Sequence, residues 1–201
     1  MHDIPESAYP ANDKPAFYAL IHSQAQALID PSLPTVANLA NIAALLFYAY
    51  NDEPVSRQIN WVGFYLSSAA TATATASTPT ASAAAADAPQ PPLTLGPFQG
   101  RIACTLIPIG KGVCGTAAAS RSTMLVKDVL NWKGHIACDS RSRSELVVPL
   151  VAGDGRLLGV FDLDCELLDG FDEEDVSGVS GVVDLLVAAC WPGVNQASAV
   201  N

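Results

Sequence analysis

A segment made almost entirely of alanine, threonine, serine and proline, residues 67–92, interrupts this 201-residue chain. It carries too little bulky apolar surface to offset the entropy cost of ordering its backbone. Because loop-closure cost grows only logarithmically with length, a hairpin accommodates such an insertion at about 1–2 kcal/mol. We therefore expect one domain over residues 14–190, with a flexible insertion at 67–92 and tails at 1–13 and 192–201.

Two helices and a strand are predicted before the insertion. Apolar residues recur at helical spacing over residues 14–29, and more strongly over residues 36–50. Two prolines between these segments favour a break, since proline lacks the amide donor. The segment QINWVGFYL, residues 58–66, is rich in aromatic and branched residues, which is typical of a strand. Its alternation would put Trp61 and Tyr65 on one face.

Further strands and a last helix are predicted after the insertion. The strand candidates are LTLG, RIACTLIP, TMLVKD, SELVVPLV and RLLGVFDLDC. The last two are separated by a Gly-Asp-Gly turn, which indicates a hairpin. A helix is expected to begin near Asp172, a favourable N-cap residue. Helices at both ends and a mostly antiparallel sheet between them predict an α+β domain.

The charge balance excludes several classes of partner. Ten basic against twenty acidic residues give a formal charge of -10, and no basic cluster is available for nucleic acid or an anionic membrane. The N-terminus lacks the basic start and apolar core of a leader, and no apolar run reaches about 18 residues. The five cysteines are expected to be free thiols in a reducing compartment, by default the cytoplasm.

Three cysteines, Cys104, Cys114 and Cys138, lie in a 35-residue stretch, each among glycines or small residues. Their strings are GPFQGRIACTLIP, GKGVCGTAAA and GHIACDSRSRSE, a placement that indicates thiol redox chemistry. None has the short CxxC spacing of a zinc knuckle. A zinc site of these thiols with His135 is an alternative, but its separations are unlike usual zinc-site spacings, so no metal is predicted.

Six motifs follow one another along the chain: NWVGFYL, LGPFQG, ACTLIPIGKGVCGTA, GHIACDS, SELVVPL and GVFDLDC. Their order and spacing closely resemble the free methionine-(R)-sulfoxide reductases, which are single-domain GAF proteins. The resemblance covers roughly residues 14–190 without the insertion. It is specific, because a generic GAF domain shares the layout of helices and sheet but not three cysteines in these contexts. It implies a GAF-like fold with the terminal helices packed on one face of the sheet.

This resemblance implies the reduction of free L-methionine (R)-sulfoxide to methionine, with peptide-bound sulfoxide excluded. No cofactor would be bound. Thioredoxin, reduced by NADPH and thioredoxin reductase, would restore the enzyme, and a homodimer through the terminal helices is expected because GAF domains often pair in this way. The alternative is a non-catalytic GAF module that senses a small ligand or oxidants, although such sensors normally act through a fused output domain.

The reaction needs a thiolate that attacks sulfur and a second thiol that resolves the sulfenic acid. Cys138 matches the catalytic cysteine of the family, and Cys104 is the expected resolving partner. Cys114 is the third candidate. A cysteine thiol is mostly protonated at neutral pH, so a nearby positive group must favour the thiolate, and His135 is placed for this role.

Carboxylates follow the last of these thiols. Glu145 matches the pocket acid of the family, and a strand would point Asp162 and Asp164 to one face. Three carboxylates can hold an ammonium group, and crowding raises the pKa of at least one, so that it can protonate the sulfoxide oxygen. Trp61 and Tyr65 would form an apolar wall for the thioether methyl. The alternatives are a polar strand face for the two aspartates and core positions for the two aromatics.

Two residues depart from the family pattern. A basic residue is common where this chain has Leu106, and serine where it has Cys165. If Cys165 lies near the pocket, it could compete as a resolving thiol, although packing is the preferred interpretation. Cys190 lies on the apolar stripe of the last predicted helix and is expected to pack.

Overall fold

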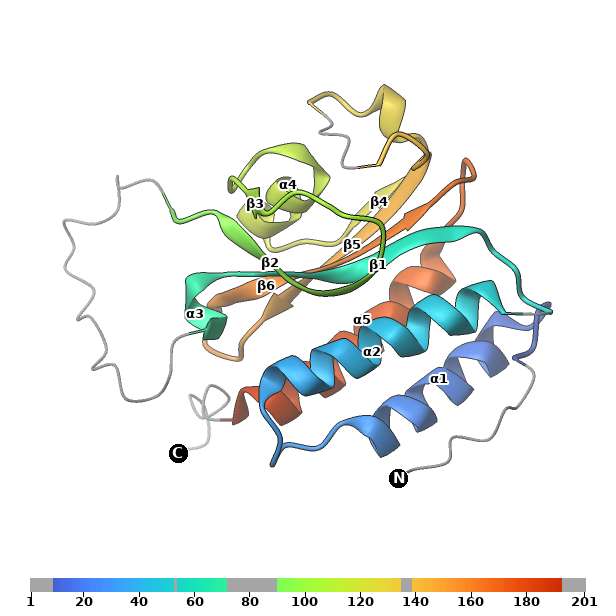
Figure 1. The fold of residues 1–201 in the computed structure, drawn as a ribbon, viewed down its shortest axis with the longest axis horizontal. Coiled ribbons are helices and arrows are strands. Elements are labelled where there is room, and N and C mark those ends of the chain that lie inside the picture. The colour runs from blue at the N-terminus through green and yellow to red at the C-terminus, as the bar shows by residue number, and fades with distance from the viewer. Residues whose placement is uncertain (1–8, 53, 72–89, 135–138, 193–201) are drawn as a thin grey trace, which may run out of the picture.

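The computed structural model describes residues 9–52, 54–71, 90–134 and 139–192 (Figure 1). The elements in chain order are α1 Lys14–Leu28, α2 Thr35–Asn51, β1 Ile59–Leu66, α3 Ser68–Thr71, β2 Leu93–Gly100, β3 Leu106–Ile107, α4 Gly112–Ser120, β4 Met124–Val126, a 3-10 helix η2 Val129–Asn131, β5 Ser144–Val151, β6 Leu157–Cys165 and α5 Glu173–Cys190. None of these helices has the length and apolar character needed to cross a membrane.

One antiparallel sheet forms the centre of the fold, with the strand order β3-β2-β1-β6-β5-β4. The strand β6 lies between β1, from before the insertion, and β5, its partner in a hairpin. Pairing of β1 with β6 places Trp61 opposite Asp164, and pairing of β5 with β6 places Glu145 opposite the same aspartate. The register therefore gathers residues that are far apart in the sequence.

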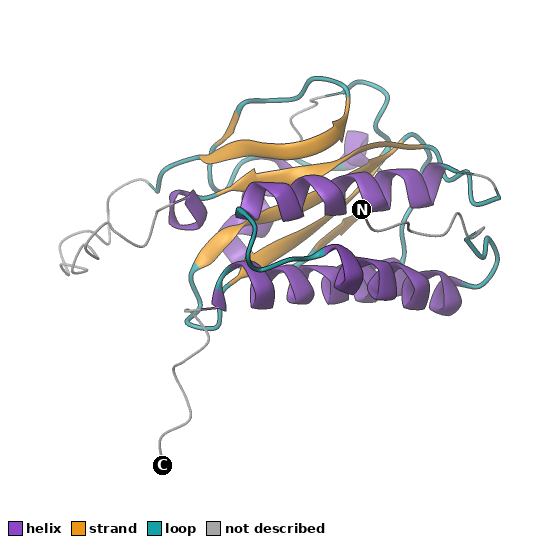
Figure 2. Cartoon of the chain, turned by 60° about the horizontal axis from the view of Figure 1, so that its bottom comes forward, coloured by secondary structure: helices purple, strands orange, loops and turns teal. Residues whose placement is uncertain are grey.

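The helices α1, α2 and α5 cover one face of the sheet, as Figure 2 shows. Alternate side chains of the central strands, among them Phe64 and Phe161, pack with these helices in the larger core. Those two rings stack with centroids 4.2 Å apart. The predicted α+β arrangement, with the terminal helices on one face of a mostly antiparallel sheet, is confirmed.

Polar residues at the first turn determine where α1 and α5 begin. The carboxylate of Asp13 accepts a hydrogen bond from the amide of Ala16 at 2.9 Å and caps α1. Asp172 and Asp175 form a reciprocal capping box at the start of α5. The predicted N-cap at Asp172 is therefore confirmed.

The opposite face of the sheet carries a smaller core around α4. Its members include the aromatic residues Trp61 and Tyr65 of β1 together with Cys114 of α4. In Figure 1, α4 and β3 lie across the sheet from α1, α2 and α5. The layer that contains α4 and β3 therefore covers one side of the sheet, and the layer of α1, α2 and α5 covers the other.

Three local predictions need correction. The helix α4 is absent from the sequence prediction, because its buried residues are mostly small and give no bulky periodic pattern. The segment RIACTLIP forms a strand only at Leu106–Ile107. Residues 68–71, predicted to be flexible, form the short helix α3, whose Ala70 packs on the larger core. The rest of the predicted insertion over 72–89 lies outside the described residues.

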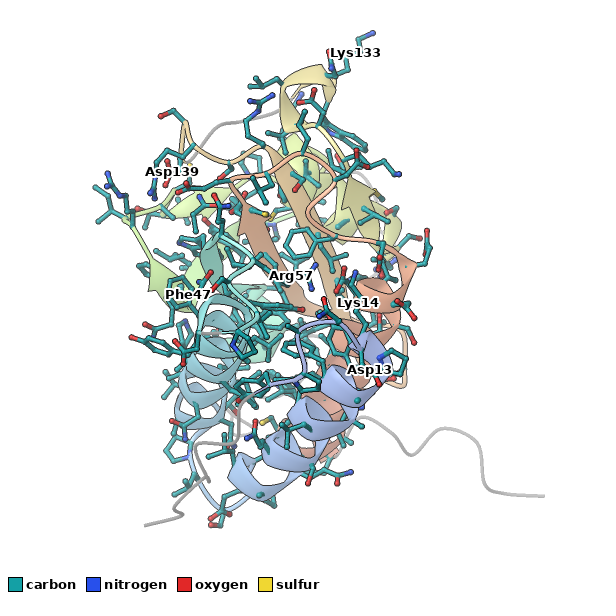
Figure 3. All side chains as sticks on the ribbon, turned by 90° about the vertical axis from the view of Figure 1, so that its right-hand side faces the viewer. Asp13, Lys14, Phe47, Arg57, Lys133 and Asp139 are labelled. Carbon is teal, nitrogen blue, oxygen red and sulfur yellow. The ribbon has the colours of Figure 1, made fainter. Side chains whose placement is uncertain are left out.

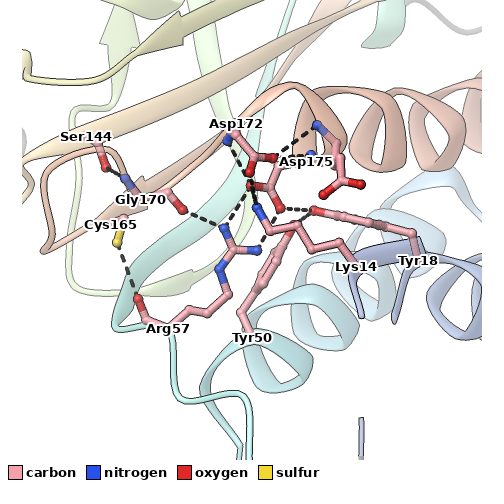
Figure 4. A network of polar contacts seen from close by, with 10 residues as sticks. Lys14, Tyr18, Tyr50, Arg57, Ser144, Cys165, Gly170, Asp172 and Asp175 are labelled. Carbon is pink, nitrogen blue, oxygen red and sulfur yellow. Dashed lines mark hydrogen bonds and ion pairs between the residues drawn. The ribbon is translucent and has the colours of Figure 1, made fainter. Parts of the chain in front are cut away.

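A buried ion-pair network joins the helical layer to the start of β1 (Figure 4). Asp175, which is fully buried on α5, accepts hydrogen bonds from Arg57 at 2.7 Å and from Lys14 at 2.8 Å. The Tyr18 hydroxyl also donates to Asp175, at 2.8 Å, and pairs with the hydroxyl of Tyr50. Figure 3 shows Lys14 at the start of α1 and Arg57 beside the helical layer. One carboxylate thus fixes α1, α2 and α5 against each other.

Burial alone would raise the pKa of Asp175, but the hydrogen bonds and charge of Arg57 and the contact with Lys14 hold it well below its ordinary value. A carboxyl whose pKa is lower in the folded than in the unfolded state adds stability above the unfolded-state value of about 3.9. That contribution is lost as pH falls through this range and below it.

The variant Asp175→Asn is expected to lower the free energy of unfolding by about 3 kcal/mol at pH 7, because it leaves Arg57 without its buried partner. Urea unfolding at pH 7 and at pH 3 checks this. The difference from the unsubstituted protein should shrink at the lower pH. Asp184→Asn, on the exposed side of the same helix, should change stability by less than about 0.5 kcal/mol. Equal stability of Asp175→Asn and the unsubstituted protein at pH 7 would contradict this account.

Candidate active site

Three carboxylates meet on the sheet face that α4 covers. Glu145 of β5 lies directly opposite Asp164 of β6, and Asp162 lies two residues earlier on the same face. Glu145 and Asp162 are each only 6% exposed, and Asp164 is partly buried. No lysine or arginine forms an ion pair with these three within the described residues. Among the residues that the structure describes, the sheet therefore holds an acidic cluster without a cationic partner.

The thiol of Cys114 reaches this cluster from α4. Its Sγ atom lies 3.7 Å from Oε1 of Glu145, and ligand atoms of Cys114, Glu145 and Asp162 all lie within 4.8 Å of one another. A tight turn before the helix positions the thiol, because the amide of Gly110 donates to the carbonyl of Gly115 at 2.7 Å. A Cβ at position 115 would lie 2.4 Å from the carbonyl oxygen of Pro108. Only glycine fits there.

The electrostatics of the cluster favour neutral forms. Burial raises the pKa of Asp162 to about 7. Burial and the neighbouring aspartates raise the pKa of Glu145 well above its usual range, and burial with the charge of Asp162 does the same for Asp164. Burial and the nearby carboxylates also raise the pKa of the Cys114 thiol. At neutral pH the cluster therefore retains protons that it can donate, and Cys114 is a poor nucleophile.

A hollow with about 510 Å³ of empty space, part of it open to solvent, lies over the cluster. All three carboxylates line it, together with Cys104 and Cys114. Both thiols face the same space. The structure thus brings two of the three predicted redox cysteines together with all of the predicted pocket acids.

A second hollow lies beside the first and contains the predicted aromatic wall. Its lining includes Trp61 and Tyr65, and it shares Asp162 and Asp164 with the first hollow. The rings of Trp61 and Tyr65 stack with centroids 5.7 Å apart. A Cβ at Gly63, between them on β1, would lie 2.6 Å from the Trp61 ring, so glycine makes room for this stack. The two aromatics are also members of the smaller core, so they serve packing as well.

The predicted nucleophile Cys138 and its neighbour His135 lie outside the described residues. Asp139, which follows Cys138 in the sequence, lines both hollows. The alternative zinc site of His135 and three cysteines includes Cys138. It therefore also extends outside the described part of the chain. Figure 3 shows Asp139 on the side of the molecule away from α1.

The two remaining cysteines lie away from the hollows. Cys165 is fully buried in the larger core, where its thiol donates to the carbonyl of Arg57 at 3.4 Å. It follows Asp164 on β6, so it points to the opposite face of the sheet. The alternative role of Cys165 as a resolving thiol is therefore wrong. Cys190 packs against the same core at the end of α5.

Sequence reasoning assigned no role to several polar residues that line the pocket. Lys111 lines the first hollow and precedes α4, and Asp139 and Ser142 line it from the other side. Asn60 of β1 donates to Ser142 at 2.9 Å. Hydrogen bonds from Arg141 lower the pKa of Asp139 to about 2, so this carboxylate stays charged. The only signals for these residues were their positions beside Cys114 and Cys138 in the chain.

Comparisons with known proteins agree with this architecture. The sequence model of the GAF domain family matches residues 57–189. The chain is 39% identical to the free methionine-R-sulfoxide reductase of Saccharomyces cerevisiae over 165 residues, which is 82% of this chain and 81% of that protein. It is also 39% identical to the free methionine-R-sulfoxide reductase of Escherichia coli, over 85% of this chain and 87% of that protein.

A solved structure gives the same result. The free methionine-R-sulfoxide reductase of Neisseria meningitidis, in complex with its substrate, superposes with a TM-score of 0.73 at 38% identity. The match covers 94% of this chain and 97% of that one. The resemblance that the sequence motifs indicated is thereby confirmed. The chain belongs to the GAF-domain family of free methionine-R-sulfoxide reductases.

Proposed function

We propose that this protein reduces free L-methionine (R)-sulfoxide to L-methionine. The observation that carries the proposal is a hollow that combines two thiols with three carboxylates, which have no ion-pair partner among the described residues, in a chain whose relatives are named for this reaction. An acidic, thiol-lined pocket suits a small molecule that carries an ammonium group and reacts with sulfur nucleophiles. A GAF sensor that binds a small ligand needs no such pair of thiols.

The carboxylates would hold the ammonium group of the amino acid. Oδ1 of Asp162 is buried and has no hydrogen-bond partner within the described part of the chain, and an ammonium donor would satisfy it. A substrate joined through its nitrogen in a peptide bond has no ammonium group, so the cluster selects free methionine sulfoxide. The substrate carboxylate would lie near Lys111 and the first amides of α4, where positive charge is available.

The redox step is assigned to Cys138 and Cys104. The Cys138 thiolate attacks the sulfoxide sulfur, and the sulfoxide oxygen takes a proton from the pocket. That oxygen is transferred to the Cys138 sulfur as the new S–S bond breaks, so that methionine departs and a cysteine sulfenic acid remains. The Cys104 thiol then attacks the sulfenic sulfur, so that a disulfide forms and water leaves. Support comes from Asp139, which is bonded to Cys138 and lines both hollows, and from Cys104, which lines the first. The raised pKa of Cys114 argues against it as the nucleophile.

Recycling is assigned to thioredoxin, which would reduce the disulfide with electrons from NADPH through thioredoxin reductase in the cytoplasm. Two exposed apolar residues beside Cys104 support a protein partner at this rim. Leu106, where the family commonly has a basic residue, is 55% exposed, and Ile102 is 91% exposed. An apolar rim next to a resolving thiol is suited to contact with a second redox protein.

Thioredoxin-coupled oxidation of NADPH tests the substrate assignment. Free L-methionine (R)-sulfoxide should be turned over, because it alone offers both the ammonium group and the assigned stereochemistry. The N-acetylated (R)-sulfoxide should react at least about 100-fold more slowly, since losing a charged contact in a buried site costs about 3 kcal/mol. The free (S)-epimer keeps that contact but presents the wrong face of its sulfur to the thiolate, so it should not be turned over. Equal turnover of the acetylated compound would reject the ammonium pocket, and no turnover of any compound would favour the GAF sensor.

Cysteine variants test the assignment of the thiols. Cys138→Ser should abolish methionine release, because no sulfenic acid can form. Cys104→Ser should release about one equivalent of methionine per protein and then stop, because recycling needs the disulfide. Quantifying methionine with and without thioredoxin separates these outcomes. Cys165→Ser, on the other face of the sheet, is the matched control and should recycle normally; unchanged turnover of Cys138→Ser would contradict the assignment.

Removing an acid from the cluster tests its role in proton donation. Asp162→Asn should lower kcat/KM by about 10²–10⁴, the range typical of a positioned acid, and Glu145→Gln should also lower it. Steady-state rates at saturating thioredoxin provide the measurement. Asp154→Asn in the β5–β6 turn, which lies outside both hollows, is the control and should retain full activity. Full activity of both pocket variants would exclude these carboxyls as the proton source.

A further inference from the structure

The cluster under α4 differs from a purely acidic patch because it contains a thiol as well as carboxylates. Among the described residues, Cys114, Glu145 and Asp162 are the group whose ligand atoms all lie within 4.8 Å of one another. Each of the three is buried. They come from α4, β5 and β6, three separately anchored elements, so their spacing is fixed by the fold rather than by one flexible loop.

The spacing suits a single tetrahedral ion. The sulfur of Cys114 lies 3.7 Å from Oε1 of Glu145. One Zn²⁺ with Zn–S and Zn–O bonds of about 2.3 and 2.0 Å holds such a pair about 3.5 Å apart. Small side-chain shifts would close the difference, and the space above the cluster leaves the fourth position open to water.

A second observation points to a missing cationic partner. Asp162 lines the hollow, and its Oδ1 atom is buried and has no hydrogen-bond partner in the described part of the chain. A buried oxygen of this kind normally has a partner, because leaving it without one costs about 1–3 kcal/mol. A metal ion would satisfy this oxygen at the same time as the thiolate of Cys114.

We propose that Cys114, Glu145 and Asp162 form a Zn²⁺ site. Zinc and substrate cannot bind there at the same time, so zinc reversibly inhibits the enzyme. The ion would occupy the position that the substrate ammonium takes. The thiolate selects a borderline-soft cation, so Mg²⁺ and Ca²⁺, which prefer all-oxygen ligands, are rejected. Zinc binding stands on the cluster geometry alone, whereas the inhibition rests on the proposed function.

Titration of the reduced full-length protein with Zn²⁺ tests the site. One equivalent is expected to bind, and Co²⁺ in its place should give a thiolate-to-metal charge-transfer absorption. Cys114→Ser should remove that absorption, and both Cys114→Ser and Asp162→Asn should weaken Zn²⁺ binding at least about tenfold. Cys190→Ser, a thiol packed at the far end of α5, is the matched control and should bind like the unsubstituted protein. Circular dichroism verifies that each variant is folded, and Glu145→Gln replaces any that is not.

The proposal is overturned if no Zn²⁺ binds, if Mg²⁺ binds as tightly, or if Cys114→Ser retains the absorption. A site that is lost in Cys138→Ser but kept in Cys114→Ser would equally overturn it. Adding L-methionine separates the two claims: it should raise the apparent Kd for Zn²⁺ by more than its own chelation of free Zn²⁺ accounts for, and N-acetyl-L-methionine should not. Zinc binding that requires Cys114 but ignores L-methionine would refute the substrate placement and the inhibition, while the metal site itself would stand.

Discussion

The central strand β6 determines the rest of the structure, because its side chains alternate between two different environments. Phe161, Leu163 and Cys165 face the helical core, and Asp162 and Asp164 face the hollow. Antiparallel pairing with β1 and β5 then adds aromatic residues on one side of these aspartates and Glu145 on the other. A shift of one residue in this register would bury the acids under the helices and expose the core.

The two polar clusters of the protein are built in opposite ways. Asp175 is buried with Arg57 and Lys14 as partners, so that its charge stabilises the helical layer. The acids of the hollow are buried with no such partner in the part of the chain that the structure describes, where burial raises their pKa and Oδ1 of Asp162 has no hydrogen-bond partner. Burial of these acids lowers the free energy of unfolding, and packing in the helical core offsets that loss. The acids therefore remain available for a ligand that carries a positive charge.

The sequence was sufficient for much of this arrangement and insufficient for the rest. The two-residue spacing of Asp162 and Asp164 predicts a shared face, and the same rule puts Cys165 on the other face, although the family pattern drew attention to it as a thiol. The helix α4 escaped prediction because its small residues pack only against a sheet that other segments build. Lys111 and Asp139 enter the pocket through loop geometry, which depends on contacts distant in sequence.

Calorimetric titration of the reduced protein with L-methionine and with N-acetyl-L-methionine at pH 7 tests the central claim most directly, since it isolates the ammonium group from the chemistry. The unpaired cluster predicts that L-methionine binds, that N-acetyl-L-methionine does not, and that Asp162→Asn weakens the binding of L-methionine. Equal affinity for the two compounds would show that the buried carboxyls do not hold the ammonium group and would contradict the account.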